Sequence, residues 1–170
     1  MTNKRVWQNL RAQLNPNPYR QYFNDANRQR LSQEIAKAEQ GHRGEIRLVV
    51  ESQLPFSVVR SGTTARQRAI HWFSELHVWD TEENSGILLY ILLAERKIEI
   101  VADRGIHKLV DQVEWNSICA QLQNELAAAH VVEGLSEALS ACARLLRQHF
   151  PIAEHADNPD ELSNELIFIP

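Results

Sequence analysis

The sequence contains few of the residues that mark secreted or membrane-spanning proteins. Only two of its 170 residues are cysteines, Cys119 and Cys142, and both lie in apolar surroundings of helical periodicity. We predict that both are reduced core residues rather than a disulfide or a redox pair. The longest apolar run, residues 86–94, is about half the ~20 residues that a membrane helix needs, and residues 1–14 lack the apolar centre of a secretion signal. These absences predict a cytoplasmic protein without a transmembrane segment.

The chain also lacks an excess of basic residues. It has 18 Lys and Arg against 22 Asp and Glu, which gives a net charge of -4. A protein that binds nucleic acid by neutralising phosphates needs the opposite balance, so we expect no nucleic-acid partner. With 44% hydrophobic and 24% charged residues, the composition is that of a globular protein. A length of 170 residues is enough for one domain with a hydrophobic core but too short for two ordinary ones.

Hydrophobic periodicity predicts both helices and strands. Residues 87–93 are apolar on both faces, as in a central strand that helices cover on both sides. Only Glu95 and Arg96 interrupt the chain before the next strand, so we expect an antiparallel hairpin. The expected helices lie at 6–14, 24–41, 64–78, 106–126 and 132–150, and the expected strands at 45–51, 87–93 and 97–102.

This order of elements predicts an α/β fold, a three-layer α/β/α sandwich in which helices flank a small mixed sheet. A crossover containing the helix at 64–78 would make the first two strands parallel. An antiparallel third strand then brings the loop at 80–86 beside residues 103–107. A parallel third strand would instead bring residues 103–107 beside the loop at 53–64.

The two ends of the chain carry opposite charges. Residues 1–43 hold eight basic and three acidic residues, whereas residues 152–170 hold acidic residues and no Lys or Arg. Either the tail is solvated, or the tail and the N-terminal helices meet within one chain or between subunits. We divide the chain into an N-terminal helical extension (1–23), an α/β domain (24–151) and an acidic C-terminal tail (152–170).

Two loops carry oxygen donors that suit a hard cation. Asp80, Glu82, Glu83 and Asn84 lie in one loop, and Asp103 follows the third strand. Ca²⁺ or Mg²⁺ requires several such oxygens converging at roughly 2.0–2.6 Å. The same residue types also serve as ordinary turn and cap residues, and their spacing is not that of an EF-hand. A cation site and plain turns are therefore both open interpretations.

Residues 60–68 form a second candidate site, because hydroxyl groups and arginines surround a helix start there. Arg60, Thr63, Thr64 and Arg66 could bind a phosphate or a carboxylate. The Gly-Lys-Ser/Thr element of a Walker motif is missing, and the alternative is a plain capped helix. The chain has no Gly-x-Ser-x-Gly elbow, and neither cysteine has the electropositive, exposed setting of a nucleophile.

Several segments together resemble the TPM domain family. The most specific elements are an Asn-x-Gly turn before an apolar strand, here at Asn84 to Gly86, a basic hairpin turn, and Asp-x-Gly after the next strand, here at Asp103 to Gly105. The resemblance spans roughly residues 24–151. It includes Gly44 to Glu51, Ala65 to Leu76, Trp79 to Thr81, Asn84 to Ile91, Arg96 to Ile100 and Ala102 to Ile106.

The resemblance implies a fourth strand, which we expect as a short edge piece at residues 166–169. It also implies a divalent ion, Ca²⁺ or Mg²⁺, near acidic loops, with Asp80, Asn84 and Asp103 as the matching residues. The family includes a thylakoid-lumen acid phosphatase and bacterial members without an assigned activity. We therefore expect a short bacterial member, without signal peptide or membrane anchor, that is a non-enzymatic interaction or regulatory module. Its implied partner is a membrane-associated protein of the same bacterial system.

The alternative function is a metal-dependent acid phosphatase that hydrolyses phosphomonoesters. In that hypothesis Asp80 and Asp103 would hold the ion, and the ion would polarise the phosphoryl oxygen and activate water. Arg60 or Arg66 would steady the phosphate. A nucleophile or a complete ligand set would distinguish the two functions, and neither can be counted in the sequence.

Overall fold

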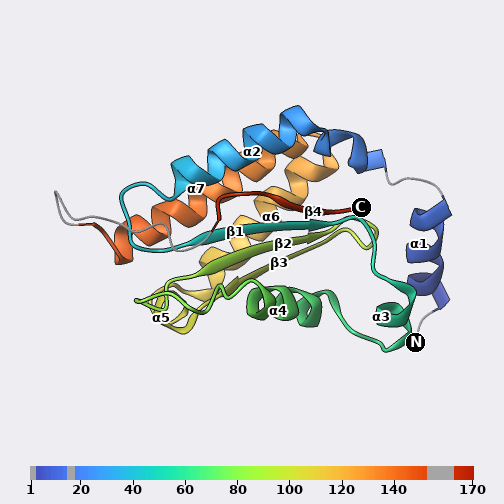
Figure 1. Cartoon of the computed structure of the whole chain (residues 1–170), viewed down its shortest axis with the longest axis horizontal. Coiled ribbons are helices and arrows are strands. Elements are labelled where there is room, and N and C mark those ends of the chain that lie inside the picture. The colour runs from blue at the N-terminus through green and yellow to red at the C-terminus, as the bar shows by residue number, and fades with distance from the viewer. Residues whose placement is uncertain (1–2, 15–17, 153–162) are drawn as a thin grey trace.

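A computed structural model describes residues 3–14, 18–152 and 163–170. It contains a four-stranded mixed sheet with helices on both faces, which confirms the predicted α/β sandwich (Figure 1). The helices are α1 (Asn3–Leu14), η1 (Pro18–Phe23), α2 (Asp25–Ala38), α3 (Phe56–Arg60), α4 (Ala65–Glu75), α5 (Arg104–His107), α6 (Gln112–Ala127) and α7 (Val131–His149). The strands are β1 (Ile46–Glu51), β2 (Ile87–Leu92), β3 (Lys97–Ala102) and β4 (Ile167–Ile169).

The strand order is β3-β2-β1-β4, with β1 parallel to both β2 and β4. β3 is antiparallel to β2, and Tyr90 lies opposite Glu99. The expected hairpin and the expected fourth strand are both present. One end of the sheet, called here the Asp103 end, collects the start of β1, the start of β2 and the end of β3. The other end, called the hairpin end, holds the ends of β1 and β2 and the turn into β3.

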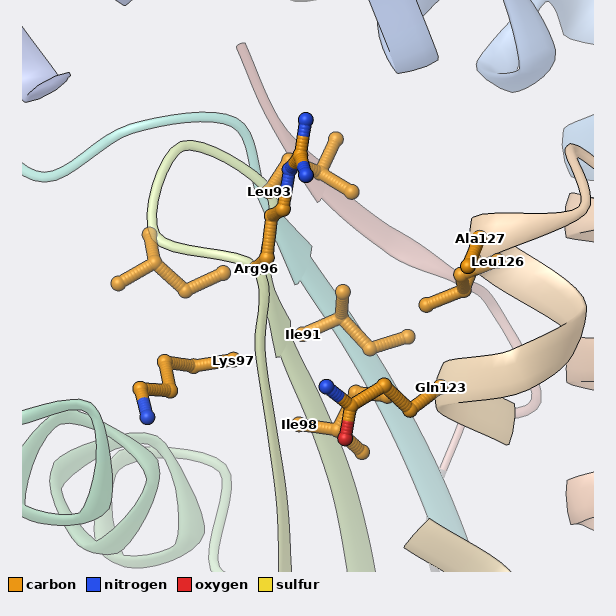
Figure 2. A pocket seen from close by; sticks show the side chains of 9 residues that line it. Ile91, Leu93, Arg96, Lys97, Ile98, Gln123, Leu126 and Ala127 are labelled. Carbon is orange, nitrogen blue, oxygen red and sulfur yellow. The ribbon is translucent and has the colours of Figure 1, made fainter. Parts of the chain in front are cut away.

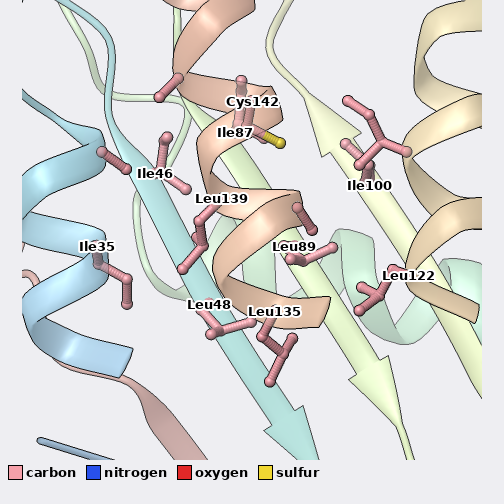
Figure 3. Close-up of a cluster of buried hydrophobic side chains, with 14 of the residues drawn as sticks. Ile35, Ile46, Leu48, Ile87, Leu89, Ile100, Leu122, Leu135, Leu139 and Cys142 are labelled. Carbon is pink, nitrogen blue, oxygen red and sulfur yellow. The ribbon is translucent and has the colours of Figure 1, made fainter. Parts of the chain in front are cut away.

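Helices α2, α6 and α7 cover one face of the sheet, and α4 covers the other (Figure 1). Successive residues of a strand point to opposite faces, so Leu48 and Leu89 pack under α7, whereas Val49 and Tyr90 pack under α4. All six residues of β1 and all six of β2 are buried. Figure 3 shows side chains of α7 inserted between those of β1 and β2, including Leu135, Leu139 and Cys142. Both cysteines are free.

Two helices differ from the sequence-based expectation. The helix expected at 106–126 is divided into two. α5, which Asp103 caps at its start, ends before Lys108, and α6 begins after Asp111, which stands at its N-cap position without a side-chain cap bond. α3 falls within residues 53–64, which were expected to form a loop. It begins directly after Pro55, which suits proline's fixed φ at a helix start.

The C-terminal end of the chain contacts the N-terminal helices. Phe168 of β4 stacks on Phe23 at 5.1 Å between ring centroids, and the Arg28 guanidinium lies 4.4 Å from the Phe168 ring. The backbone N–H of Leu166 donates to Ser32 Oγ at 3.1 Å. The end of the tail and the N-terminal helices therefore meet within one chain. Most acidic residues of the tail fall in 153–162, outside the described residues.

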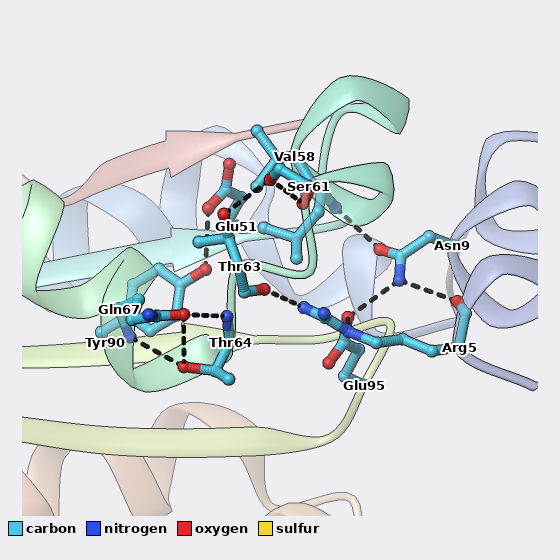
Figure 4. A network of polar contacts seen from close by, with 11 residues as sticks. Arg5, Asn9, Glu51, Val58, Ser61, Thr63, Thr64, Gln67, Tyr90 and Glu95 are labelled. Carbon is cyan, nitrogen blue, oxygen red and sulfur yellow. Dashed lines mark hydrogen bonds and ion pairs between the residues drawn. The ribbon is translucent and has the colours of Figure 1, made fainter. Parts of the chain in front are cut away.

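α1 covers the hairpin end of the sheet. Arg5 Nε donates to Glu95 Oε1 at 2.7 Å, and Asn9 Nδ2 donates to the same oxygen at 2.9 Å. Asn9 Oδ1 in turn accepts the backbone N–H of buried Leu54 at 2.8 Å. Figure 4 shows these bonds joining α1 to the hairpin turn and to the segment before α4.

A buried histidine holds the link between α2 and β1. His42 Nε2 lies 2.7 Å from the Ala38 carbonyl oxygen, and His42 Nδ1 accepts the Gly44 N–H at 3.2 Å. This pair of bonds suits the neutral ring with its proton on Nε2. Burial lowers the pKa of His42 below its usual value, and the nearby Arg147 charge adds to the effect.

Candidate functional site

The two loops singled out in the sequence lie side by side at the Asp103 end. The Asn84 carbonyl accepts the N–H groups of Gly105 at 2.9 Å and Ile106 at 3.3 Å, and Asp103 N donates to the Gly86 carbonyl at 2.9 Å. Asn84 has a positive φ of 54°, in the left-handed region that asparagine tolerates better than most residues. The antiparallel pairing of β3 therefore joins the loop at 80–86 and the turn at 103–105 into one surface.

The glycines of this surface are required by close backbone approach. A Cβ atom at Gly105 would lie 2.6 Å from the Asn84 carbonyl oxygen and would also collide with the Glu83 carbonyl oxygen. At Gly86 it would collide with the Val78 carbonyl. Only glycine lets the two loops pack this closely, which gives the Asn-x-Gly and Asp-x-Gly patterns a physical basis.

Asp103 is the most unusual side chain of this surface. It is 6% exposed and stands at the N-cap of α5, where its Oδ1 accepts the Arg104 N–H at 2.6 Å. Its Oδ2 is buried and has no hydrogen-bond partner among the described residues. A buried carboxylate oxygen without a donor is unfavourable, and most such groups are satisfied by water, an ion or protein.

The other two predicted cation ligands differ in exposure. Asn84 is half-buried and lies against the Asp103 turn through its backbone. Asp80 belongs to the same loop but is exposed, and its N–H donates to the His77 carbonyl at 2.8 Å. In the described part of the chain, no three His, Cys, Asp or Glu side chains gather as a metal site would require. The structure thus brings Asn84 and Asp103 together and leaves Asp80 facing solvent.

An ion pair holds the loop at 80–86 against the start of β1. Arg43 Nη1 lies 2.6 Å from Glu83 Oε1, and the Ser85 hydroxyl donates to the Arg43 carbonyl at 3.1 Å. Ser85 N donates to the hydroxyl of buried Thr81 at 3.0 Å. Two bonds therefore tie the second half of the loop to Arg43, and a third closes the loop on itself.

The predicted anion-binding residues lie toward the hairpin end, and most of their polar groups already have partners. Thr64 caps α4 in a capping box with Gln67. The Thr63 carbonyl accepts from the Arg5 guanidinium, and the Thr63 hydroxyl lies 2.8 Å from Ser61 Oγ. Figure 4 shows these contacts around the start of α4.

The two arginines of that group point to different surroundings. The Arg66 guanidinium donates to the Ile100 carbonyl of β3 and lies 3.9 Å from Glu99 Oε2. Arg60 is exposed at the last position of α3, which follows β1 at the hairpin end. Arg60 and Asp103 therefore lie at opposite ends of the sheet.

A buried polar cluster under α4 was missed by the sequence analysis. Glu51, with 0% exposure, accepts from Arg68 Nε at 2.9 Å and from Arg68 Nη2 at 2.8 Å. The Tyr90 hydroxyl donates to Glu51 Oε2 at 2.7 Å, and Trp72 Nε1 donates to the same oxygen at 3.3 Å. No local pattern reveals this cluster, because its members come from β1, β2 and α4.

This cluster raises the pKa values of Arg68 and Tyr90. The hydrogen bonds to Glu51 raise the pKa of Arg68, so its guanidinium stays charged. Burial, followed by the Glu51 charge, raises the pKa of Tyr90, so its hydroxyl keeps its proton and remains a donor. The cluster is enclosed and its main bonds are made, which fits a structural role that fixes α4 on the sheet.

A small apolar pocket lies between the β2–β3 turn and the end of α6. Its volume is about 130 Å³, and Ile91, Leu93, Ile98 and Leu126 supply its apolar wall. Figure 2 shows Lys97 directed to the side of β3 away from α6. No local sequence pattern reveals this pocket, because its walls come from separate elements.

Comparisons with known proteins agree with this architecture. A family model described as the TPM domain matches residues 17–145. The NMR structure of the BA42 protein from the psychrophilic bacterium Bizionia argentinensis has a similar fold, with a TM-score of 0.75 and 22% sequence identity. The similarity covers 86% of this chain and 95% of that protein. No curated protein matches this chain. None of the helices described is long and apolar enough to cross a membrane.

Proposed function

The chain belongs to the TPM domain family, and from this premise we propose that it is a non-enzymatic interaction or regulatory module that binds a divalent cation at the Asp103 end. Asp103 carries the proposal, because its buried Oδ2 has no partner among the described residues. A cation at this oxygen would remove an unfavourable buried group. Because the chain belongs to this family, we propose a membrane-associated protein as its partner. We place both in the cytoplasm, where the free cysteines would stay reduced.

The donors of the surface fit Ca²⁺ better than they fit Mg²⁺. Asp103 supplies a carboxylate oxygen, Asn84 supplies an amide oxygen from a half-buried side chain, and Asp80 lies in the same loop. Ca²⁺ accepts six to eight oxygens in flexible geometry and takes carbonyl oxygens and waters among them. Mg²⁺ demands a near-ideal octahedron, which an irregular loop supplies less readily.

The placement of the basic side chains supports a non-enzymatic role. The phosphatase hypothesis needs Arg60 or Arg66 to hold a phosphate at the ion. Arg60 lies at the hairpin end, and the Arg66 guanidinium donates to the Ile100 carbonyl. Arg60 therefore lies at the opposite end of the sheet from Asp103, and the Arg66 guanidinium is engaged by the backbone of β3.

Thermal melting with and without CaCl₂ tests the cation site. A ligand that binds only the folded protein must raise the melting temperature. At about 1 mM Ca²⁺, a site with a Kd of about 10 μM contributes about 2.7 kcal/mol, and this raises Tm by roughly 5–11 °C for a domain of this size. Asp103→Asn keeps a capping side chain but removes the negative charge, so the shift should largely disappear.

Asp111→Asn is the matched control, because Asp111 is also an N-cap residue but is exposed and makes no side-chain cap bond. This variant should keep the full Ca²⁺ shift. An unchanged Tm for the unsubstituted protein, or an equal loss of the shift in both variants, would remove the proposed site.

A chromogenic phosphomonoester distinguishes the module from a phosphatase. We expect no turnover by the purified chain, with or without added Ca²⁺ or Mg²⁺. Turnover that is abolished both by EDTA and by Asp103→Ala would replace the proposed function with the enzymatic one.

A further inference from the structure

The outer edge of β3 has no neighbouring strand among the described residues. β3 is the last strand on its side of the sheet, next to β2 only. In an antiparallel pair, every second residue directs its N–H and C=O groups away from the neighbouring strand. The Ile100 carbonyl accepts from the Arg66 side chain, so Ile100 is one of the residues that face outward. Ile98 and Ala102, two positions away on either side, face outward as well.

A groove of about 490 Å³ runs along this edge. α4 borders it through Arg66, and α6 borders it on the other face of the sheet through Trp115, Asn116 and Cys119. Trp115 is 4% exposed, and its indole Nε1–H has no acceptor among the described residues. The groove thus combines strand-edge groups that need partners with a buried donor that needs an acceptor.

We propose that an extended segment of a partner protein docks in this groove as a fifth strand, paired with β3. The segment alternates apolar residues, facing α6, with acidic residues, facing α4. Addition of a strand to an open sheet edge is a common mode of peptide recognition, in which backbone hydrogen bonds give affinity and side-chain pockets give specificity. This inference rests on the interaction role proposed above and names the surface that would serve it.

The helices around β3 determine that the occupant is an extended segment and not a second copy of this chain. α4 and α6 pack on opposite faces of β3. Pairing β3 with its own copy would place two strands about 4.8 Å apart, and each strand would bring its two covering helices. Packed helices need about 8–10 Å between their axes, so the helices of the two copies would collide. A segment without covering helices meets no such obstacle.

The side chains beside the edge determine the chemistry of the segment. Ile98, Ile100 and Ala102 pack toward the α6 face, so neighbouring residues of an added strand on that face meet these apolar side chains beside the polar Gln112 and Asn116. Glu99 points to the α4 face, where it meets Arg66 at 3.9 Å. Lys97 lies on that same face, away from Gln123, and is exposed with no ion pair among the described residues (Figure 2). Acidic side chains on this face of the segment would pair with Lys97 and with the half-exposed Arg66, whose guanidinium would exchange the Ile100 carbonyl for a carboxylate and leave that carbonyl to the added strand.

The test uses an acetylated peptide of sequence Glu-Ile-Glu-Val-Glu-Ile and the full chain, followed by NMR. On binding, the amides of Ile98, Ile100 and Ala102 should exchange with solvent at least tenfold more slowly, because they become hydrogen-bonded. Asn116→Trp fills the groove from an exposed position of α6 and should weaken binding at least tenfold. Ala120→Trp, exposed on the same helix but outside the groove lining, should bind as the unsubstituted chain does.

Two further peptides separate the contributions of backbone and charge. One peptide is N-methylated at the alternate residues whose N–H groups point toward β3, and it should not bind. The other has the sequence Lys-Ile-Lys-Val-Lys-Ile and should bind at least tenfold more weakly than the acidic peptide. No protection of the three amides, or equal binding by the Asn116→Trp variant, would overturn the proposal. So would a dimer at micromolar concentration in which these amides are already protected without peptide.

The outcome is independent of the cation site. If peptide binding fails while Ca²⁺ still raises Tm, only the docking surface is lost. If the peptide binds at the β3 edge while Ca²⁺ has no effect, the cation site fails and the interaction role stands.

Discussion

Replacing Arg68 by methionine should strongly destabilise the fold. Glu51 has 0% exposure, and Arg68 supplies two of the four hydrogen bonds that its carboxylate accepts. Arg68→Met leaves a buried negative charge whose remaining hydrogen bonds, among the described residues, come from Tyr90 and Trp72. Removing one partner of a buried ion pair costs about 3–5 kcal/mol. For a domain of this size, that corresponds to a Tm lower by roughly 6–20 °C.

The double variant Glu51→Gln/Arg68→Met isolates the cause of this loss. It removes the unpaired charge while keeping most of the volume, so it should be more stable than Arg68→Met alone. Urea unfolding followed by circular dichroism gives the four free energies of a double-mutant cycle, and the coupling should exceed about 1 kcal/mol.

Arg60→Met is the matched control, because Arg60 is exposed, and it should change stability by less than about 0.5 kcal/mol. If the free energy of unfolding of Arg68→Met lies within about 1 kcal/mol of that of the unsubstituted protein, the assignment of Glu51 as an enclosed charge is refuted.

Two other predictions concern titration and thiol reactivity. The pKa of His42 is lowered in the folded protein, so the unfolded chain binds the proton more readily. The free energy of unfolding should therefore fall as the pH drops below about 6.5, by at most about 1.4 kcal/mol per pH unit. In urea unfolding between pH 7.5 and 5.5, His42→Gln should lose less stability than the unsubstituted protein, and exposed His71→Gln serves as the control. The same dependence of stability on pH in all three proteins would contradict this. Burial raises the pKa of the Cys142 thiol to about 12. An aromatic disulfide reagent at neutral pH should therefore label half-buried Cys119 first and Cys142 only on unfolding. Equal labelling rates of the two thiols in the native protein would contradict the enclosed position of Cys142.

The local features of the fold could be predicted from sequence. The run at 87–93 is apolar on both faces, and β2 is indeed a central strand with both faces covered. The short polar interruption at Glu95 and Arg96 predicted the antiparallel hairpin, and this pairing brought the loop at 80–86 beside Asp103. Such features depend on residues close together in the chain, whose periodicity directly reports which side is buried.

Helix boundaries were less predictable where caps compete with hydrophobic spacing. Apolar residues continue at helical spacing from Ile106 to Leu126, yet the chain leaves the helix at Lys108 and starts a second helix after Asp111. Periodicity reports only that one side of the segment is buried. It does not report whether the backbone is continuous.

Only the tertiary structure decided which polar groups meet. Glu51 stands at the end of an apolar strand and gave no sign of its contacts with Arg68 and Tyr90, which depend on the parallel register of β1 with β2 and on the position of α4. The separation of Arg60 from Asp103 likewise follows from the direction of each strand. The sequence by itself determined the strands, most of the long helices, the hairpin and the glycine turns. Contacts between distant segments required the strand order and register, because these are set by packing of the whole chain and not by any local pattern.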